Sequence, residues 1–290
     1  MVDESRILEV LREGRKVGHV SLPWKVYAFV MRDLRNWLTY RLWLMLDVAG
    51  TLFNVAAYFF FSKIATAAML ADAGYVGSYF TFAVVGIAFQ EYVSFSFNGV
   101  IRSIRDEQVR GTMETVLSAT TVATFLTGSS AFRFIESTVF LLAAMAVGIG
   151  LGAVFTGSPA SLLSVVLILG LLVASHLPIG ILGAALSMKT KLGDPVAQIF
   201  SWLTQLLSGI LYPLNIVPLW LRPFTLFTPL TYSLDAARRC LINGDSLLQP
   251  AVYWNIVYLL LYVVISFPIA LYAFKRSFES VRRDGELGHY

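Results

Sequence analysis

A short charged segment near the middle of the chain, residues 101–120, holds the residue types best suited to contact another protein. Glu107, Arg110 and Glu114 are spaced three and four residues apart, so on a helix they share one face and can pair. Apolar residues lie between these charges, and Gly111 permits a bend or the close approach of another backbone. The composition favours a protein-docking helix, and an ordinary solvated connection is the alternative.

The elements on either side of this segment are predicted to cross a membrane. Of the 290 residues, 57% are hydrophobic and only 14% are charged, against about 25% charged residues in soluble domains. Residues 137–188 contain no Asp, Glu, Lys or Arg. As one helix this run would be about 78 Å long, whereas the hydrocarbon core of a bilayer is about 30 Å thick. The run must therefore cross twice, with a turn at residues 157–159.

Long apolar runs predict an all-α polytopic membrane protein with six transmembrane helices. The predicted spans are residues 42–62, 75–100, 134–155, 161–187, 195–212 and 251–274. Basic residues gather before the first span, in the second and fourth connections and in the tail, which places both termini in the cytoplasm. The fifth connection departs from this alternation with Arg222, Arg238 and Arg239.

Three parts follow from this pattern. Residues 1–40 form a cytoplasmic N-terminal segment, residues 41–275 the six-helix transmembrane domain, and residues 276–290 a cytoplasmic tail. Within the first part, aromatic and apolar residues from Trp24 to Leu38 recur at helical spacing with basic residues between them. This pattern predicts an amphipathic helix in the cytoplasmic interface, in contact with membrane lipid. A helix packed on the protein's own cytoplasmic face is the alternative.

Two stretches resemble a known family. Residues 105–114, RDEQVRGTME, are similar to the E-x-x-R-G-T-x-E segment of type-2 ATP-binding cassette (ABC-2) permeases, which are six-helix export subunits. Near the end of the chain, Ser208-Gly209, Tyr212-Pro213-Leu214 and Pro229-Leu230-Thr231-Tyr232, followed by Asp235 and Arg238, resemble the family's stretch between the fifth and sixth spans. One departure follows Leu117, where Ser118-Ala119 stands in place of the family's Thr-Pro or Ser-Pro.

The resemblance implies a coupling helix over residues 102–117, seated in a groove of a separate ATPase subunit. The residues that match the family's positions for this contact are Arg105, Glu107, Arg110, Gly111, Thr112 and Glu114. It also implies short re-entrant helices over residues 213–240 at the external side, where prolines break any continuous helix. The gate residues there would be Tyr212, Pro213, Pro229, Tyr232 and Arg238.

Polar groups inside the predicted spans are candidates for a substrate path, since ionisable groups in a membrane usually face the protein interior. The path candidates are Glu91, Gln90, Phe95, Gln205 and Ser208. A structural hydrogen bond between helices is the alternative role for Glu91. For Asp47 and the Arg133–Glu136 pair, near the interface, a structural role is favoured. His176 is expected to donate to a carbonyl freed by Pro178.

Several kinds of site are absent from the sequence. There is no G-x-x-x-x-G-K-[ST] phosphate loop, no H-E-x-x-H and no G-x-S-x-G. The single cysteine, Cys240, excludes an internal disulfide and a cysteine-based metal site. We therefore expect no catalytic or metal-binding residues and no cofactor in this chain, with ATP and Mg²⁺ on the partner ATPase.

The function predicted from these patterns is that of a permease in the cell (plasma or inner) membrane. It would export an amphipathic or hydrophobic substrate, of the drug, lipid or glycan class, by alternating access. Its partners would be the ATPase subunit, a second permease chain in a homodimer, and membrane lipid, with no nucleic acid. An ion- or proton-coupled secondary transporter that uses Glu91 is the alternative, although no convincing internal repeat supports it.

Overall fold

The computed structural model describes residues 21–64, 70, 72–112, 115–116, 118, 120–190 and 193–283. Within these ranges the chain is helical, without β-strands. In chain order the helices are α2 (Leu22–Thr39), α3 (Arg41–Phe61), α5 (Tyr79–Val109), α7 (Val122–Gly150), α8 (Pro159–Thr190), α9 (Gly193–Leu207), η1 (Leu214–Ile216), α10 (Arg222–Leu226), α11 (Pro229–Arg238), η2 (Arg239–Asn243) and α12 (Pro250–Arg283).

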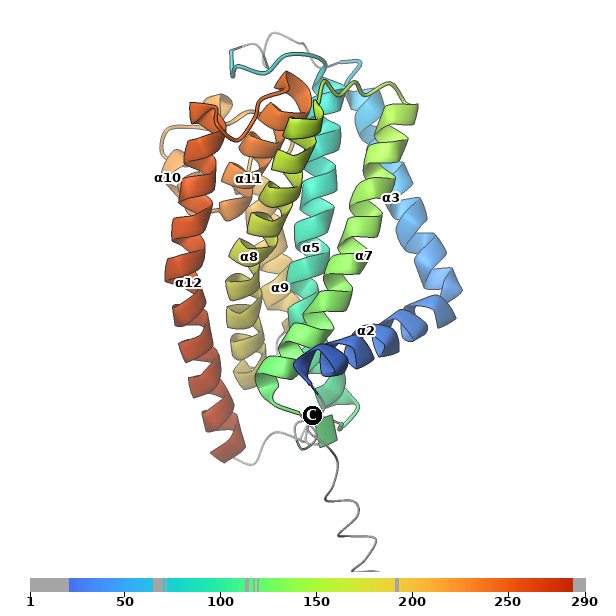
Figure 1. The fold of residues 1–290 in the computed structure, drawn as a ribbon, viewed down its shortest axis with the longest axis vertical. Helices are drawn as coiled ribbons and strands as arrows, with labels where there is room; N and C mark the ends of the chain where they lie inside the picture. Colours follow the sequence, from blue (N-terminus) through green and yellow to red (C-terminus); the bar gives the residue numbers. More distant parts are fainter. Residues whose placement is uncertain are drawn as a thin grey trace, which may run out of the picture.

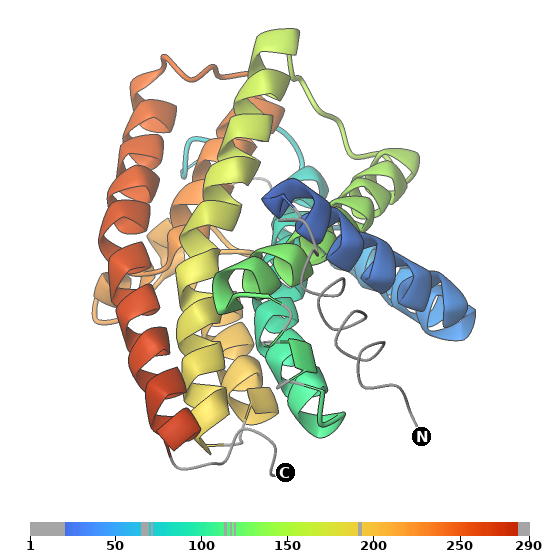
Figure 2. The same ribbon diagram turned by 60° about the horizontal axis from the view of Figure 1, so that its bottom comes forward.

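Helix α5 stands in the middle of the bundle and packs on α3, α7, α8, α9 and α11 (Figure 1). Every residue from 80 to 89 is buried, as expected for a helix that is apolar on all sides. Helix α12 packs on α8 at one edge, and α3 lies at the other. Helix α2 packs on α7 and lies across its foot (Figure 2). The bundle is therefore built around α5, and both candidate sites described below involve this helix.

Proline residues set several helix starts. Helices α8, α11 and α12 begin at Pro159, Pro229 and Pro250, and Pro23 lies in the first turn of α2. A proline costs no hydrogen bond at this position, because the first backbone N–H groups of a helix have no partner within the helix. The start of α7 is capped instead by Thr121, whose side chain accepts a hydrogen bond from the Thr124 backbone N–H.

Four of the described helices are long and apolar enough to cross a membrane. The spanning stretches are Leu44–Phe61 in α3, Thr127–Gly150 in α7, Pro159–Leu186 in α8 and Pro250–Val281 in α12. The two other predicted spans correspond to α5, which carries the polar pair Gln90–Glu91, and to α9, which has 15 residues. At 1.5 Å per residue α9 is about 22 Å long, short of a hydrocarbon core of about 30 Å. The count of six spans stays a prediction.

Helix boundaries correct the sequence-based expectations at three places. The single helix predicted over residues 102–117 is wrong, because α5 continues without a break to Val109 and the chain then turns. Helix α7 begins at Val122, twelve residues before the predicted third span, and α12 continues to Arg283, beyond the predicted sixth span. The apolar run marks the part of a helix that can lie in lipid, and helices extend past it where polar residues continue the helical pattern.

Candidate functional site

The motif that contains Glu107 forms the end of α5. Gly111 has φ +67°, the left-handed conformation that glycine adopts at low cost. The backbone N–H of Thr112 donates to the Glu107 carbonyl at 2.9 Å. This six-residue hydrogen bond with a left-handed glycine inside it is a Schellman motif, which satisfies a free carbonyl at a helix C-terminus. The Gly-Thr pair of the motif therefore stops the helix and turns the chain.

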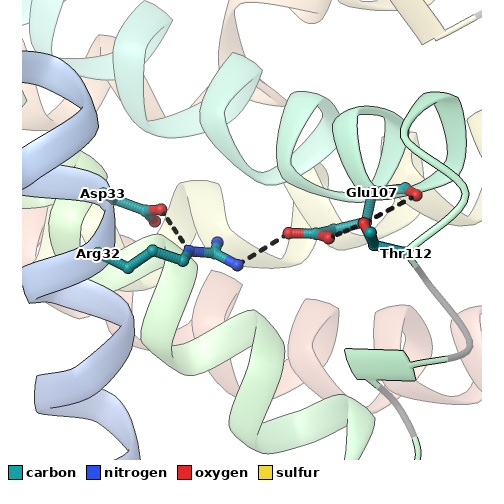
Figure 3. Close-up of polar contacts among 4 residues, drawn as sticks. All are labelled: Arg32, Asp33, Glu107 and Thr112. Atoms are coloured by element: carbon teal, nitrogen blue, oxygen red, sulfur yellow. Dashed lines mark hydrogen bonds and ion pairs between the residues drawn. The ribbon is translucent and has the colours of Figure 1, made fainter. Parts of the chain in front are cut away.

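The Glu107 carboxylate is buried beneath this turn and connects it to α2 (Figure 3). One oxygen accepts a hydrogen bond from the Thr112 hydroxyl at 2.5 Å, and the other accepts from Arg32 Nη1 at 2.9 Å. Arg32 Nε also donates to Asp33 at 2.9 Å. Desolvation acts to lower the pKa of the Arg32 guanidinium, but the hydrogen bonds and charges of Asp33 and Glu107 outweigh it and raise the pKa. The bridge is thus an ion pair between a buried anion and a half-buried cation.

Helix α2 is held on α7 by aromatic contacts. Phe29 packs edge to face on Phe125 with ring centroids 5.8 Å apart, and Trp37 packs on Phe132 at 6.2 Å. The face of α2 that carries Trp24, among others, stays exposed. Helix α2 therefore packs on the protein through one face, as the packed-helix alternative expected, and keeps an aromatic and apolar face open. Its place in the membrane interface stays a prediction.

The predicted ATPase-contact residues separate into two groups. Glu107 points into the protein, whereas Arg110, Gly111 and Thr112 form the exposed turn. The expected pairing of Glu107 with Arg110 is replaced by the pair with Arg32. Arg105 is half-buried in the last turns of α5. Glu114 lies outside the described residues.

The path candidates do not meet at one point. Gln205 Nε2 of α9 lies 3.5 Å from Gln90 Oε1 of α5, so these two amides face each other. Glu91 faces the other way and accepts a hydrogen bond from Asn54 of α3 at 3.4 Å. Ser208 is buried, and its hydroxyl has no partner among the residues that the structure describes. The side chain of Phe95 lies outside the described part.

At the opposite end of the bundle, Arg238 of α11 holds the chain segment that follows α9. Its guanidinium is buried and donates to the carbonyls of Gly209 at 2.8 Å and Ile210 at 2.5 Å. It also lies over the ring of Phe82 in α5, 3.4 Å from the centroid. A methyl group on Gly86 would stand 2.1 Å from the Ile210 carbonyl, so only glycine fits this crossing. We call Arg238 and the carbonyls that it contacts the Arg238 clamp.

Asp235, one turn before Arg238, joins three further elements. One carboxylate oxygen accepts from the Tyr75 hydroxyl at 2.5 Å, and the other accepts from Arg239 at 3.0 Å and from Asn255 of α12 at 2.6 Å. Burial and the Asp235 carboxylate raise the pKa of the Tyr75 phenol, which therefore stays a hydrogen-bond donor. Tyr75 and Asn255 are too far apart in sequence to be linked to this site from the sequence alone.

The other predicted gate residues surround the Arg238 clamp. Pro213 and Pro229 are buried. The Tyr212 hydroxyl donates to the Leu206 carbonyl at the end of α9. The Tyr232 hydroxyl donates to the Leu226 carbonyl at 3.0 Å, and its ring stacks on Tyr258 of α12. Together these contacts satisfy carbonyls that the broken helices leave without partners in the backbone.

Two other residues considered in the sequence analysis, His176 and Cys240, lie in the interior of the protein. His176 is buried, and its Nδ1 lies 2.8 Å from the Leu172 carbonyl. The carbonyl that Pro178 frees is that of Ala174, four residues before it, so the expected acceptor was wrong. Cys240 is buried and free. Within the described ranges, no group of three or more His, Cys, Asp or Glu side chains is placed to hold a metal ion.

One known protein family matches most of the chain. A family model described as "ABC-2 family transporter protein" matches residues 51–272, more than half of the chain. The matched part begins in α3 and ends in α12, so it contains the Glu107 turn, the amide pair of Gln90 and Gln205, and the Arg238 clamp. No curated protein matches the chain significantly.

Proposed function

Because the chain belongs to the ABC-2 transporter family, it is a multi-pass membrane permease component of an ABC transporter, and we propose that it exports an amphipathic or hydrophobic substrate from the cytoplasm. The substrate would be of the drug, lipid or glycan class. ATP and Mg²⁺ would bind to a separate ATPase subunit, and two copies of this chain would form the transport path. The ion- or proton-coupled alternative is not proposed, because the matching family is that of ABC transporters.

In the proposed topology six helices cross the membrane, namely α3, α5, α7, α8, α9 and α12. Both termini and the Glu107 turn lie in the cytoplasm, as the distribution of basic residues predicts. Helix α2 lies in the cytoplasmic interface. The chain between α9 and α12 forms the external re-entrant part, where the Arg238 clamp shelters the broken backbone from lipid.

The exposed turn at Arg110–Thr112 is proposed as the contact with the ATPase, together with Arg105 and Glu114 from the same segment. One observation carries this proposal: the turn is rigidly closed by a Schellman motif, and the same buried carboxylate that supports it bonds to α2. A displacement of the turn would be transmitted to α2 through the ion pair with Arg32. It would also be transmitted to the centre of the bundle through α5, which is continuous from the turn. Glu107 then positions the contact surface without itself touching the ATPase.

We place the substrate path along α5 and α9, where Gln90 faces Gln205 and where Glu91, Phe95 and Ser208 belong to the same two helices and the turn after them. Alternating access would separate or join these helices in the two chains. The external gate would be formed by Tyr212, Pro213, Pro229, Tyr232 and Arg238, whose hydroxyl and guanidinium groups hold the ends of broken helices.

The test is co-purification of the chain with an ABC ATPase subunit from the same organism. Arg110→Glu reverses the charge on the exposed turn and is expected to reduce ATPase capture by about tenfold or more, the size of a lost charge-assisted contact. Arg276→Glu makes the same charge change on an exposed residue near the end of α12, at the same end of the bundle, and is expected to leave capture unchanged. Equal capture by both variants would place the ATPase contact elsewhere.

A further inference from the structure

A polar cavity of about 430 Å³ lies beside the Glu107 turn, between α2, α3, α5 and α7. In Figure 1, α2 runs from the foot of α5 and α7 out to the lower end of α3, so these helices frame the cavity. The volume falls within the range of about 300–1,000 Å³ that is usual for small-ligand sites. The proposed substrate path does not use this cavity, and of the proposed ATPase contact only Arg110 lines it.

The lining carries three guanidinium groups and four carboxylates. These are Arg32, Arg110, Arg133, Asp33, Asp47, Glu107 and Glu136. Five of them pair with one another in ion pairs of 2.9 Å. The remaining two, Asp47 and Arg110, have no ion-pair partner within 4.0 Å among the described residues, although the charge of Arg102 acts on Asp47. One anion and one cation are thus left available in the same cavity.

Aromatic side chains supply the rest of the recognition surface. Trp37, Tyr40 and Phe132 line the cavity, and aromatic faces attract organic ammonium groups. The indole N–H of Trp37 is itself enclosed by the protein, so Trp37 contributes to this lining through its ring and not through a hydrogen bond.

The position of the cavity along the bundle points to the source of the ligand. The apolar stretches of α3 and α7 begin at Leu44 and Thr127, so Asp47 lies one turn inside the hydrocarbon edge. Next to it on α3, Leu42, Met45 and Leu46 are exposed. In the proposed membrane placement, the cavity lies at the depth of the lipid headgroups and apolar side chains continue from it toward the acyl chains.

We propose that this cavity binds the headgroup of a zwitterionic aminophospholipid of the cytoplasmic leaflet. The ammonium group pairs with Asp47 against the aromatic side chains, and the phosphate pairs with Arg110. The inference rests on the membrane placement given under the proposed function and is independent of ATP coupling. It assigns a lipid partner to the junction of α2 and α5, whether that lipid is substrate or structural.

The experiment measures which lipids stay bound to the full chain when it is released from nanodiscs for native mass spectrometry. The nanodiscs contain equal amounts of phosphatidylethanolamine and phosphatidylglycerol with the same acyl chains. The wild-type chain is expected to retain phosphatidylethanolamine about tenfold over phosphatidylglycerol, the size of one charge-assisted contact. Asp47→Asn, which keeps the shape of the side chain and removes the partner of the ammonium group, is expected to abolish most of this preference.

The control is Asp72→Asn, the same change on an exposed carboxylate outside the cavity, and it is expected to retain the wild-type preference. An unchanged preference in Asp47→Asn would overturn the proposal, as would equal retention of the two lipids by the wild-type chain. A further arm adds soluble phosphoethanolamine, which carries the headgroup without acyl chains. Displacement of the bound lipid at equal concentration would show that the ligand is a soluble zwitterion and would also overturn the lipid assignment. Because no ATPase is present, failure here leaves the transport proposal untouched.

Discussion

The Glu107 turn and the Arg238 clamp each hold a charged side chain against a helix end, but they differ in their partners. Arg238 is fully enclosed and bonds to two backbone carbonyls and an aromatic face, which cannot leave without unfolding the chain around them. Glu107 bonds to Arg32, whose side chain is 38% exposed and belongs to a helix at the edge of the bundle. A contact between side chains on separate helices can break and re-form, so we propose that the first site fixes the fold and that the second transmits movement.

The largest expected loss of stability is at the Arg238 clamp. Arg238→Ala leaves the Gly209 and Ile210 carbonyls buried without donors, and we expect a loss of about 3 kcal/mol or more in the free energy of unfolding. The measurement is the midpoint of denaturant unfolding of the purified protein in detergent. Arg222 also donates to backbone carbonyls but is exposed, so Arg222→Ala should cost much less. Equal losses in the two variants would remove the distinction between the clamp and an ordinary surface arginine.

A smaller effect is expected where α5 meets the clamped segment. Gly86→Ala places a methyl group 2.1 Å from the Ile210 carbonyl and 2.6 Å from Arg238 Nη2. Since backbone must shift to admit it, we expect destabilisation of about 1–3 kcal/mol, measured in the same way. Gly170 in α8 has nothing within 4 Å of an added methyl group, so Gly170→Ala should be neutral or stabilising. A stable Gly86→Ala protein would show that the crossing is looser than described.

At the Glu107 turn we expect a smaller loss of stability than at the Arg238 clamp, but a larger effect on the ATP-dependent movement of the helices. Glu107→Gln keeps an acceptor for Thr112 and removes the ion pair with Arg32, at a cost of about 1 kcal/mol because Arg32 is partly exposed to solvent. Its functional effect is measured as ATP-dependent labelling of Gln205→Cys by a maleimide, with the ATPase subunit bound. We expect ATP to change this labelling in the wild-type background and not in Glu107→Gln.

The matched variant for this test is Glu279→Gln, an exposed carboxylate on α12. It should keep both the stability and the ATP-dependent labelling. If Glu107→Gln also keeps the labelling response, the bridge to α2 has no part in coupling and only supports the turn.

The smallest effect is expected at the edge of the clamp. Tyr232→Phe removes one hydroxyl, which donates to the Leu226 carbonyl at 3.0 Å, while the ring can still stack on Tyr258. The expected loss in the free energy of unfolding is about 1 kcal/mol or less. A loss as large as that of Arg238→Ala would mean that the short helices unfold as one unit with the clamp.

The two regions also differ in how far the sequence could predict them. The stretch rich in prolines predicted broken helices near the clamp, because proline acts through the local backbone. Gly111 was expected only to permit a bend within one helix, whereas it ends α5. The sequence did not identify Arg32 as the partner of Glu107, 75 residues away, or Tyr75 and Asn255 as partners of Asp235. Contacts between distant segments depend on the packing of α2, α5 and α12, which no local pattern encodes.

The helix boundaries show the same limit. An apolar run predicted α3 to within one residue at each end, because α3 is flanked on both sides by changes in backbone direction. The end of α5 was misplaced, because good helix formers continue past the predicted membrane edge at residue 100 and nothing stops the helix before Gly111. The family resemblance predicted one helix over residues 102–117, whereas α5 ends at Val109 and the chain then turns; the contact of this segment with an ATPase stays a prediction.

The central claim is that the Arg110–Thr112 turn faces the cytoplasm and is covered by an ATPase. It is tested most directly by labelling Arg110→Cys with a membrane-impermeant maleimide in oriented vesicles. The native Cys240 adds little background, since it is fully enclosed and burial raises the pKa of its thiol to about 11. The account predicts labelling in inverted vesicles only, and protection when the ATPase subunit is added. Labelling from the outer side, or labelling that the ATPase subunit does not reduce, would contradict it.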